Sequence, residues 1–154
     1  MSIESDTEEI LAVHWDWFES NRGLDVERMR QSFADPGFLQ FSLSGSITRG
    51  IEEKVKGWTA LRDRGFDFGE LSVVEQPVVH VSGDLAYLTV VWSSRLVGEI
   101  GAGTVGASPD PIVIRVTEIY RRDDGKGAPA WRIWHFHASQ GIAPVVPEPT
   151  EQAD

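Results

Sequence analysis

The chain has 154 residues, of which 41% are hydrophobic and 10% are aromatic, so its composition indicates one folded domain and excludes a wholly disordered chain. Its 24 acidic and 14 basic side chains give a net charge of −10, which argues against nucleic acid and anionic membrane surfaces as partners. Cysteine is absent, which excludes disulfides and thiol nucleophiles.

The first half of the chain predicts three helices and one strand. Residues 7–22 carry apolar and aromatic side chains at helical spacing. A second helix is predicted over 24–35, with Asp25 as its N-cap, and a third over 50–65. Between the last two helices, residues 38–45 alternate between apolar and polar side chains as a strand does.

The second half predicts an antiparallel meander. Four strand candidates are separated by Gly, Pro or Asp-Gly turns: 66–83, 85–98, 111–125 and 130–139. Helices followed by such a meander predict an α+β domain over 1–141, with the helices packed on one face of a curved sheet. The proline-rich and acidic residues 142–154 are expected to form an extended tail.

Two features bear on location. The acidic N-terminus lacks the basic and apolar regions of a secretory signal, and no window approaches the roughly 20 apolar residues of a membrane-spanning helix. We therefore expect a cytoplasmic protein without membrane contact.

A glycine motif, "GAGTVG" at 101–106, has the spacing of a dinucleotide-binding loop. Such a loop needs a helix directly after it, whose N-terminus receives the pyrophosphate. Prolines and a strand follow here instead, so we predict no nucleotide cofactor. The 98–111 segment is expected to be a hairpin loop that could act as a lid.

His135 and His137 lie two positions apart in a strand, so strict alternation places them on one face. They could share a metal ion if a third ligand joined them, with His80 and Glu118 as candidates. Hydrogen-bonded structural histidines are the favoured alternative, and we predict no metal.

Tryptophans and strand arginines each have two interpretations. The six tryptophans could fill a core and an oligomer interface, or they could line a cavity for a ring-shaped ligand. Arg95 and Arg115 could point inwards to bind a carboxylate, or outwards on the sheet.

The chain resembles the nuclear transport factor 2-like (NTF2-like), or cystatin-like, superfamily and its SnoaL-like members. The strings that carry the resemblance are "WFESNRGLDVERMRQSFADPGFLQF" (17–41), "TRGIEEKVKGW" (48–58), "VVHVSGDLAYL" (78–88) and "YRRDDGKGAPAWRIWHFHAS" (120–139). The second half is particularly similar to the association domain of calcium/calmodulin-dependent protein kinase.

The resemblance implies a cone-shaped α+β barrel, with the N-terminal helices packed in a strongly curved, mostly antiparallel sheet and a pocket at the wide end. It also implies a homodimer formed through the outer face of the sheet. On this basis Arg132, Trp134, Phe136 and Ala138 would line the pocket, whereas His135, His137 and Ser139 would face outwards.

The chain departs from these relatives at their functional positions. Val91, Thr117 and Ala138 stand where the association domain holds pocket arginines, and Arg95 and Arg115 could partly replace them. In the ketosteroid isomerase branch an early strand holds a carboxylate base, but Phe41 stands there in this chain, which argues against that mechanism.

Two functions remain open. The first is a cofactor-independent lyase, dehydratase or isomerase acting on a hydrophobic cyclic substrate. His14 would then be the base, desolvated by Trp17 and Phe18, and Tyr87 or Arg115 would stabilise an oxyanion. His14 could equally be a core residue without a chemical role.

The second function is a non-catalytic ligand-binding or oligomerisation module, because one fold can host both uses. Either way we expect a small-molecule ligand, no nucleic acid and no cofactor. The residues predicted to line the pocket are Trp17, Phe18, Phe41, Trp58, Arg95, Thr117, Trp134 and Phe136.

Overall fold

A computed structural model describes residues 2–98 and 110–142. The glycine motif at 101–106 lies outside the described residues, as do nearly all of the predicted 98–111 loop and 142–154 tail. The helices and strands are α1 (Ile3–Ser20), α2 (Val26–Arg30), β1 (Leu39–Phe41), β2 (Ile47–Arg49), α3 (Ile51–Asp63), β3 (Ser72–Ser82), β4 (Leu85–Ser94), β5 (Ile112–Arg122) and β6 (Trp131–Gly141).

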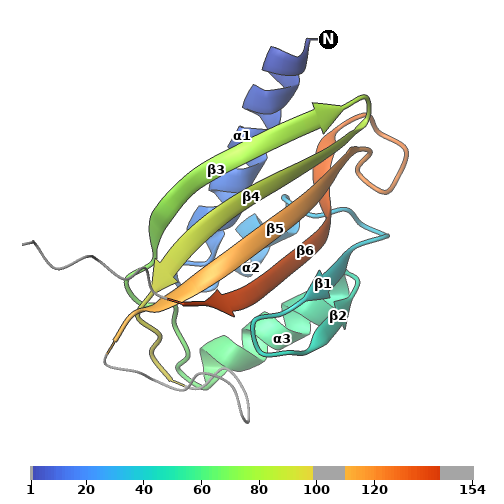
Figure 1. Ribbon diagram of the computed structural model, residues 1–154. Helices are drawn as coiled ribbons and strands as arrows, with labels where there is room; N and C mark the ends of the chain where they lie inside the picture. Colours follow the sequence, from blue (N-terminus) through green and yellow to red (C-terminus); the bar gives the residue numbers. More distant parts are fainter. Residues whose placement is uncertain (1, 99–109, 143–154) are drawn as a thin grey trace, which may run out of the picture.

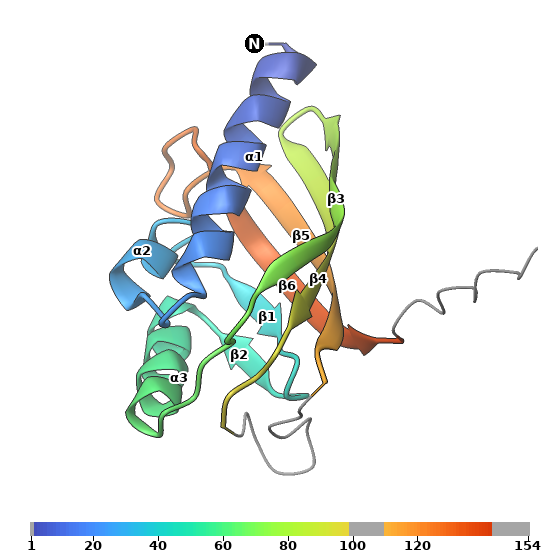
Figure 2. The ribbon, with the colours of Figure 1, turned by 90° about the vertical axis from the view of Figure 1, so that its left-hand side faces the viewer.

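Six strands form one sheet in the order β2-β1-β6-β5-β4-β3. All neighbouring strands pair antiparallel except β1 and β6, which pair parallel. The sheet curves, and α1 lies along its inner face, with α2 and α3 continuing the helical layer (Figure 1, Figure 2). This arrangement confirms the predicted α+β class, with helices on one face of a curved, mostly antiparallel sheet. None of the helices in the described residues is long and apolar enough to cross a bilayer.

Helix α1 begins four residues earlier than predicted. Ser2 is its N-cap, and Ser2 and Ser5 exchange side chain-to-backbone hydrogen bonds as a capping box. From there one stripe of the helix is buried against the sheet: Asp6, Ile10, His14, Trp17 and Phe18.

The early strand is a hairpin rather than a single strand. The chain reverses between β1 and β2 through a loop in which Gly45 has a positive φ of 84°. Asp25 caps α2 as predicted by accepting a hydrogen bond from the Arg28 amide (3.1 Å). Helix α2 itself ends at Arg30, five residues before its predicted end.

A β-bulge breaks the predicted alternation in β6. Ile119 of β5 pairs with His135, whereas the next residue, Tyr120, pairs with Ile133, so Trp134 is an extra residue in β6. Trp131 and Ile133 therefore face the core before the bulge, and Phe136 and Ala138 face it after the bulge. Strict alternation along β6 would put residues 131 and 133 on the face opposite 136 and 138, and the bulge is the reason that it fails here.

An ion pair fastens the first turn of α1 to β5. Both terminal nitrogens of Arg122 donate to the Asp6 carboxylate, at 2.6 and 2.8 Å, and the Trp131 indole donates to it at 3.1 Å. Asp6 is 3% exposed, so these three hydrogen bonds satisfy a buried carboxylate that would otherwise be costly. The helix is thereby held over the end of the sheet where β5 and β6 meet.

Candidate functional site

A cavity of about 260 Å³ opens where α1, α3, the β1–β2 hairpin and the inner face of the sheet converge. Its aromatic wall is formed by Trp17, Trp58, Phe68, Trp92 and Phe136. Several polar residues also line it: Asn21, Gln40, Ser42, Ser44, Ser46, Thr48 and Lys54. A largely apolar concave site with a few polar groups is typical of small-molecule binding.

Lys54 of α3 projects its amine into an aromatic cage. The residue is 3% exposed, and its Nζ lies 4.6 Å from the ring centroid of Trp17 and 4.9 Å from that of Trp58. Three further rings lie within 5.8 Å of the same nitrogen: Phe33, Phe38 and Phe136. Ring faces attract a cation at these distances, so the cage suits a positively charged nitrogen.

Gln40 is the hydrogen-bond partner of the amine. The Lys54 Nζ donates to Gln40 Oε1, and Gln40 Nε2 in turn donates to Ser42 Oγ at 2.9 Å. Because a lysine amine donates when charged, it fixes the orientation of the Gln40 amide, with oxygen towards Lys54 and nitrogen towards Ser42. The strand β1 thus positions the polar side of the cavity.

Burial controls the charge of Lys54. It lowers the pKa of the amine from 10.5 to about 7, because removing water disfavours the charged form. Among the described residues, no carboxylate oxygen lies within 4.0 Å of the amine, so no ion pair raises its pKa again. Near neutral pH the cavity therefore holds an amine that can gain or lose a proton.

Two indole N–H groups of the cavity wall also lack a partner. Nε1 of Trp17 and Nε1 of Trp92 are buried without a hydrogen-bond acceptor among the described residues. Buried donors are seldom left unsatisfied, because the lost hydrogen bond to water costs free energy. Trp17 and Trp92 thus hold hydrogen-bond donors that the described residues leave unused.

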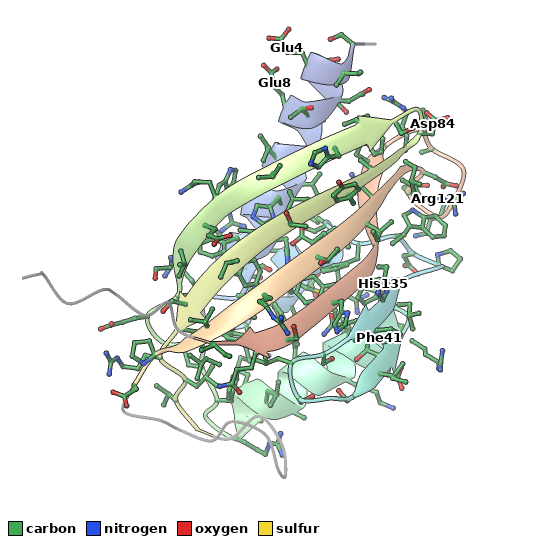
Figure 3. All side chains as sticks on the ribbon, viewed as in Figure 1. Glu4, Glu8, Phe41, Asp84, Arg121 and His135 are labelled. Carbon is green, nitrogen blue, oxygen red and sulfur yellow. The ribbon has the colours of Figure 1, made fainter. Side chains whose placement is uncertain are left out.

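The residues predicted to line the pocket divide into two groups. Trp17, Trp58 and Phe136 line the cavity. The other five do not: Phe18 is buried in the core, Phe41 and Thr117 lie on the outer face, Arg95 is exposed, and Trp134 is the bulged residue. Phe41 and His135 lie beside each other on that outer face (Figure 3), with ring centroids 4.9 Å apart.

His14 lies in a buried polar cluster beneath the cavity wall. Its Nδ1 lies 2.9 Å from Glu118 Oε2, which also accepts a hydrogen bond from the Tyr120 hydroxyl at 2.6 Å. Burial, followed by the Glu118 charge and this hydrogen bond, raises the pKa of Tyr120 well above its usual value. All three side chains are fully buried, and none of them lines the cavity.

Tyr87 and Arg115, the predicted oxyanion stabilisers, lie on the outer face of the sheet. Tyr87 is 44% exposed and stacks on His80, and Arg115 is exposed on β5. Strand alternation turns both residues away from the inner face, where Leu88 and Val116 point. The structure therefore does not bring them together with His14.

The two histidines of β6 face outwards. His135 is half-buried, with Nδ1 2.9 Å from the Leu39 carbonyl oxygen, whereas His137 is exposed. The edge of Phe41 contacts both rings. Within the described residues, no three histidine, aspartate or glutamate side chains gather as a metal site would require.

Lys54 is not among the site residues predicted from the sequence. The segment "IEEKVKGW" has as many charged residues as a solvent-exposed helix, so its sequence predicts that both lysines are exposed. The spacing of residues could have indicated its burial. Ile51, Lys54 and Trp58 are three and four residues apart, so they lie on one side of α3, and that side is buried. A lone lysine on an apolar helical stripe is unusual, because lysine is almost never fully buried.

A scan against protein-family models and a search of curated proteins found no match for this chain. Solved structures do match it. A cystatin-like protein from Caulobacter vibrioides is 18% identical, with a TM-score of 0.69, and the match covers 89% of this chain and 90% of that one. A proposed dehydratase of the NTF2-like family from Streptomyces avermitilis is 16% identical (TM-score 0.66), covering 92% and 100%.

A third match is a proposed calcium/calmodulin-dependent protein kinase type II association domain from Thiobacillus denitrificans. It is 21% identical, with a TM-score of 0.63, and covers 85% of this chain and 94% of that one. The chain therefore has the cystatin-like fold of NTF2-like proteins, which confirms the resemblance seen in the sequence at the level of fold. Fold alone does not select an activity, because function resides in the site.

Proposed function

We propose that this chain binds a small hydrophobic, cyclic molecule in its cavity and exchanges a proton with it through Lys54, without a cofactor. The reaction would be of the lyase, dehydratase or isomerase type. The observation that carries the proposal is the Lys54 amine, buried in an aromatic cage on the cavity wall with a pKa of about 7. A general acid or base works best when its pKa lies near the working pH.

The polar groups around Lys54 suit a ligand with an oxygen atom. The amine of Lys54, a residue that lines the cavity, is a hydrogen-bond donor, and the surrounding rings accept the apolar body of the ligand. We place the proton transfer at Lys54 rather than at His14, because Lys54 lines the cavity and His14 does not. The dehydratase likeness is consistent with this class of reaction but is a likeness of fold.

A non-catalytic binding module is the second candidate. Among the described residues, the other ionisable side chains that line the cavity are Glu53 and Arg64, and both are exposed. That part of the chain therefore brings no second buried acid or base to the cavity. In such a module Lys54 would anchor a carboxylate or carbonyl group of the ligand without further chemistry. An enzyme would release a chemically converted ligand, whereas a binding module would release the ligand unchanged.

The same proposal includes a homodimer formed through the outer face of the sheet. Exposed apolar side chains lie on this face in two places: Val78, Leu85 and Tyr87 on the neighbouring strands β3 and β4, and Phe41 on β1 beyond β5 and β6. Burying them between two chains would remove apolar surface from water.

The binding proposal is tested by a native mass spectrum of freshly purified protein, repeated after mild activation. We expect extra mass that leaves on activation and identifies the ligand class. Gly57 offers a matched pair of variants, because it lines the cavity and a Cβ added to it meets no atom within 4 Å. We expect Gly57→Ala to keep the bound mass and Gly57→Leu, which fills space in the cavity, to lose it.

Both substitutions replace a glycine inside a helix, which favours folding by roughly 0.5–1 kcal/mol, so loss of the ligand would not reflect unfolding. Bare protein in every preparation, with no binding of added hydrophobic compounds, would contradict the proposal.

A further inference from the structure

We propose that the Lys54 amine is a nucleophile and that the ligand of the cavity is an aldehyde or ketone, which it binds covalently as an imine. This inference rests on the proposed function above and specifies its substrate class. It also gives Lys54 a role beyond proton exchange.

The geometry around Nζ favours this chemistry. Lys54 lines the cavity, and its nitrogen lies against Trp17, Trp58 and Phe136, which are rings of the cavity wall. A carbonyl group bound against those rings therefore lies next to the nitrogen. Five aromatic rings surround it at 4.6 to 5.8 Å and keep water from the reacting atoms. Their faces attract cations, so the protonated imine is stabilised in the place that a lysine ammonium now occupies.

The amine is also available in its reactive form. Only a neutral amine has the electron pair that attacks a carbonyl carbon, and lysines desolvated in apolar pockets are activated in this way. With a pKa of about 7, on the order of half of the Lys54 amines are neutral near pH 7. An ordinary lysine, with a pKa near 10.4, is neutral in only about one molecule in 2,500 at that pH.

The step balances without an oxidant or reductant. The nitrogen electron pair forms a carbon–nitrogen bond as the carbonyl π electrons move to oxygen, and a proton passes from the nitrogen to that oxygen to give a carbinolamine. The carbon–oxygen bond then breaks, the hydroxyl leaves as water with the second proton of the nitrogen, and the nitrogen electron pair forms the imine double bond. A proton taken up from solvent gives the protonated imine. Gln40 Oε1 accepts a hydrogen bond from Nζ before attack and holds the nitrogen in place.

The chain has three lysines, which makes a site-specific test clean. Lys56 and Lys126 are exposed and serve as internal references. The protein is incubated with 2-naphthaldehyde and cyanoborohydride, which reduces an imine to a stable secondary amine, and peptide mapping locates the label. Naphthalene-2-methanol, which has the same ring system but no carbonyl group, measures reversible binding through quenching of tryptophan fluorescence.

We expect much more label at Lys54 than at Lys56 or Lys126, and we expect the alcohol to block the Lys54 label by competition. Lys54→Arg should remove this preferred label, whereas Lys56→Arg should leave it in place. The ratio of Lys54 to Lys56 labelling should fall about tenfold from about pH 6 to about pH 8. Over that range the neutral fraction rises about tenfold for a pKa of about 7 and about a hundredfold for an ordinary lysine.

Two other outcomes separate the two proposals. Saturable binding of the alcohol, with the label absent from Lys54 or spread equally over the three lysines, would overturn the imine and leave the binding pocket standing. If neither the alcohol nor the aldehyde binds, the proposed function fails and the imine fails with it. The peptide map of the unchanged chain decides the matter even if Lys54→Arg does not fold.

Discussion

Lys54 makes the stability of the fold depend on pH. Its pKa is about 7 in the folded state and 10.5 in the unfolded chain, so between these values the unfolded state binds more protons. The free energy of unfolding must therefore rise with pH in that window, with a slope of up to about 1.4 kcal/mol per pH unit. Below about pH 7 both states are protonated, and the full cost of burying the charge is present.

Replacing Lys54 by methionine should remove this slope, because methionine has a similar shape and no charge. We expect the unfolding free energy of the unchanged chain to gain about 2 kcal/mol relative to Lys54→Met from about pH 7.5 to about pH 9. Urea denaturation at a series of pH values measures it. Lys56→Met is the control, because Lys56 lies two residues away from Lys54 but is exposed, and this variant should keep the slope. Parallel curves of unfolding free energy against pH for Lys54→Met and the unchanged chain would contradict a lowered pKa of Lys54.

The aromatic part of the site was predictable only in part, and the polar part was not predicted. Trp17, Trp58 and Phe136 were expected at the cavity, Phe136 on the strength of the family resemblance, whereas Phe68 and Trp92 were not expected there. Lys54 and Gln40 become notable only when β1 and α3 meet, because the amine and the amide are then buried together. Long-range contacts of this kind leave no local signature in one sequence.

At the scale of elements, α1 depends on its ion pair with β5. The hydrogen bonds from Arg122, followed by that from Trp131, lower the pKa of Asp6 below its usual value of 3.8. A lowered carboxylate pKa contributes stability above the unfolded value, and that contribution is lost as the pH falls through the folded value.

We expect Asp6→Asn to lower the melting temperature at pH 7. The Arg122 side chain is only 12% exposed, and the substitution removes the carboxylate that compensates for the burial of its charge. The variant should also lose less stability than the unchanged chain below about pH 4. Thermal unfolding followed by circular dichroism measures both effects. Glu4→Gln removes the same charge from the same helical turn at an exposed position (Figure 3), and an equal loss in that control would contradict a specific role for Asp6.

The strands of the sheet were predictable from local sequence patterns, but the bulge in β6 was not. Four strands of the meander were predictable because β-branched and aromatic residues alternate between turns, and α+β packing follows from their order. The bulge at Trp134 was not, since an extra residue leaves the composition of the strand unchanged. Trp134 instead packs beside Gly37, where an added Cβ would lie 2.2 Å from its ring, a contact visible only in three dimensions.

At the scale of the whole molecule, the proposed dimer makes the outer face of the sheet testable. We expect the chain to be a dimer by light scattering and Val78→Glu to be a folded monomer, because a buried charge would face the partner chain. Ile3→Glu introduces the same charge at the start of α1, which is exposed and away from that face, and should remain dimeric. A monomer for the unchanged chain would contradict the dimer and leave the cavity unaffected.

The central claim is that the cavity holds an amine that is half neutral near pH 7, and the most direct test is to titrate the three lysines by nuclear magnetic resonance. Side-chain carbon signals next to each amine report its protonation. We predict that one signal titrates near pH 7 and is missing in Lys54→Met, while the other two titrate near about pH 10.4. If all three lysines titrate near pH 10.4, Lys54 is an ordinary cation, and both the proton transfer and the imine proposed for it are excluded.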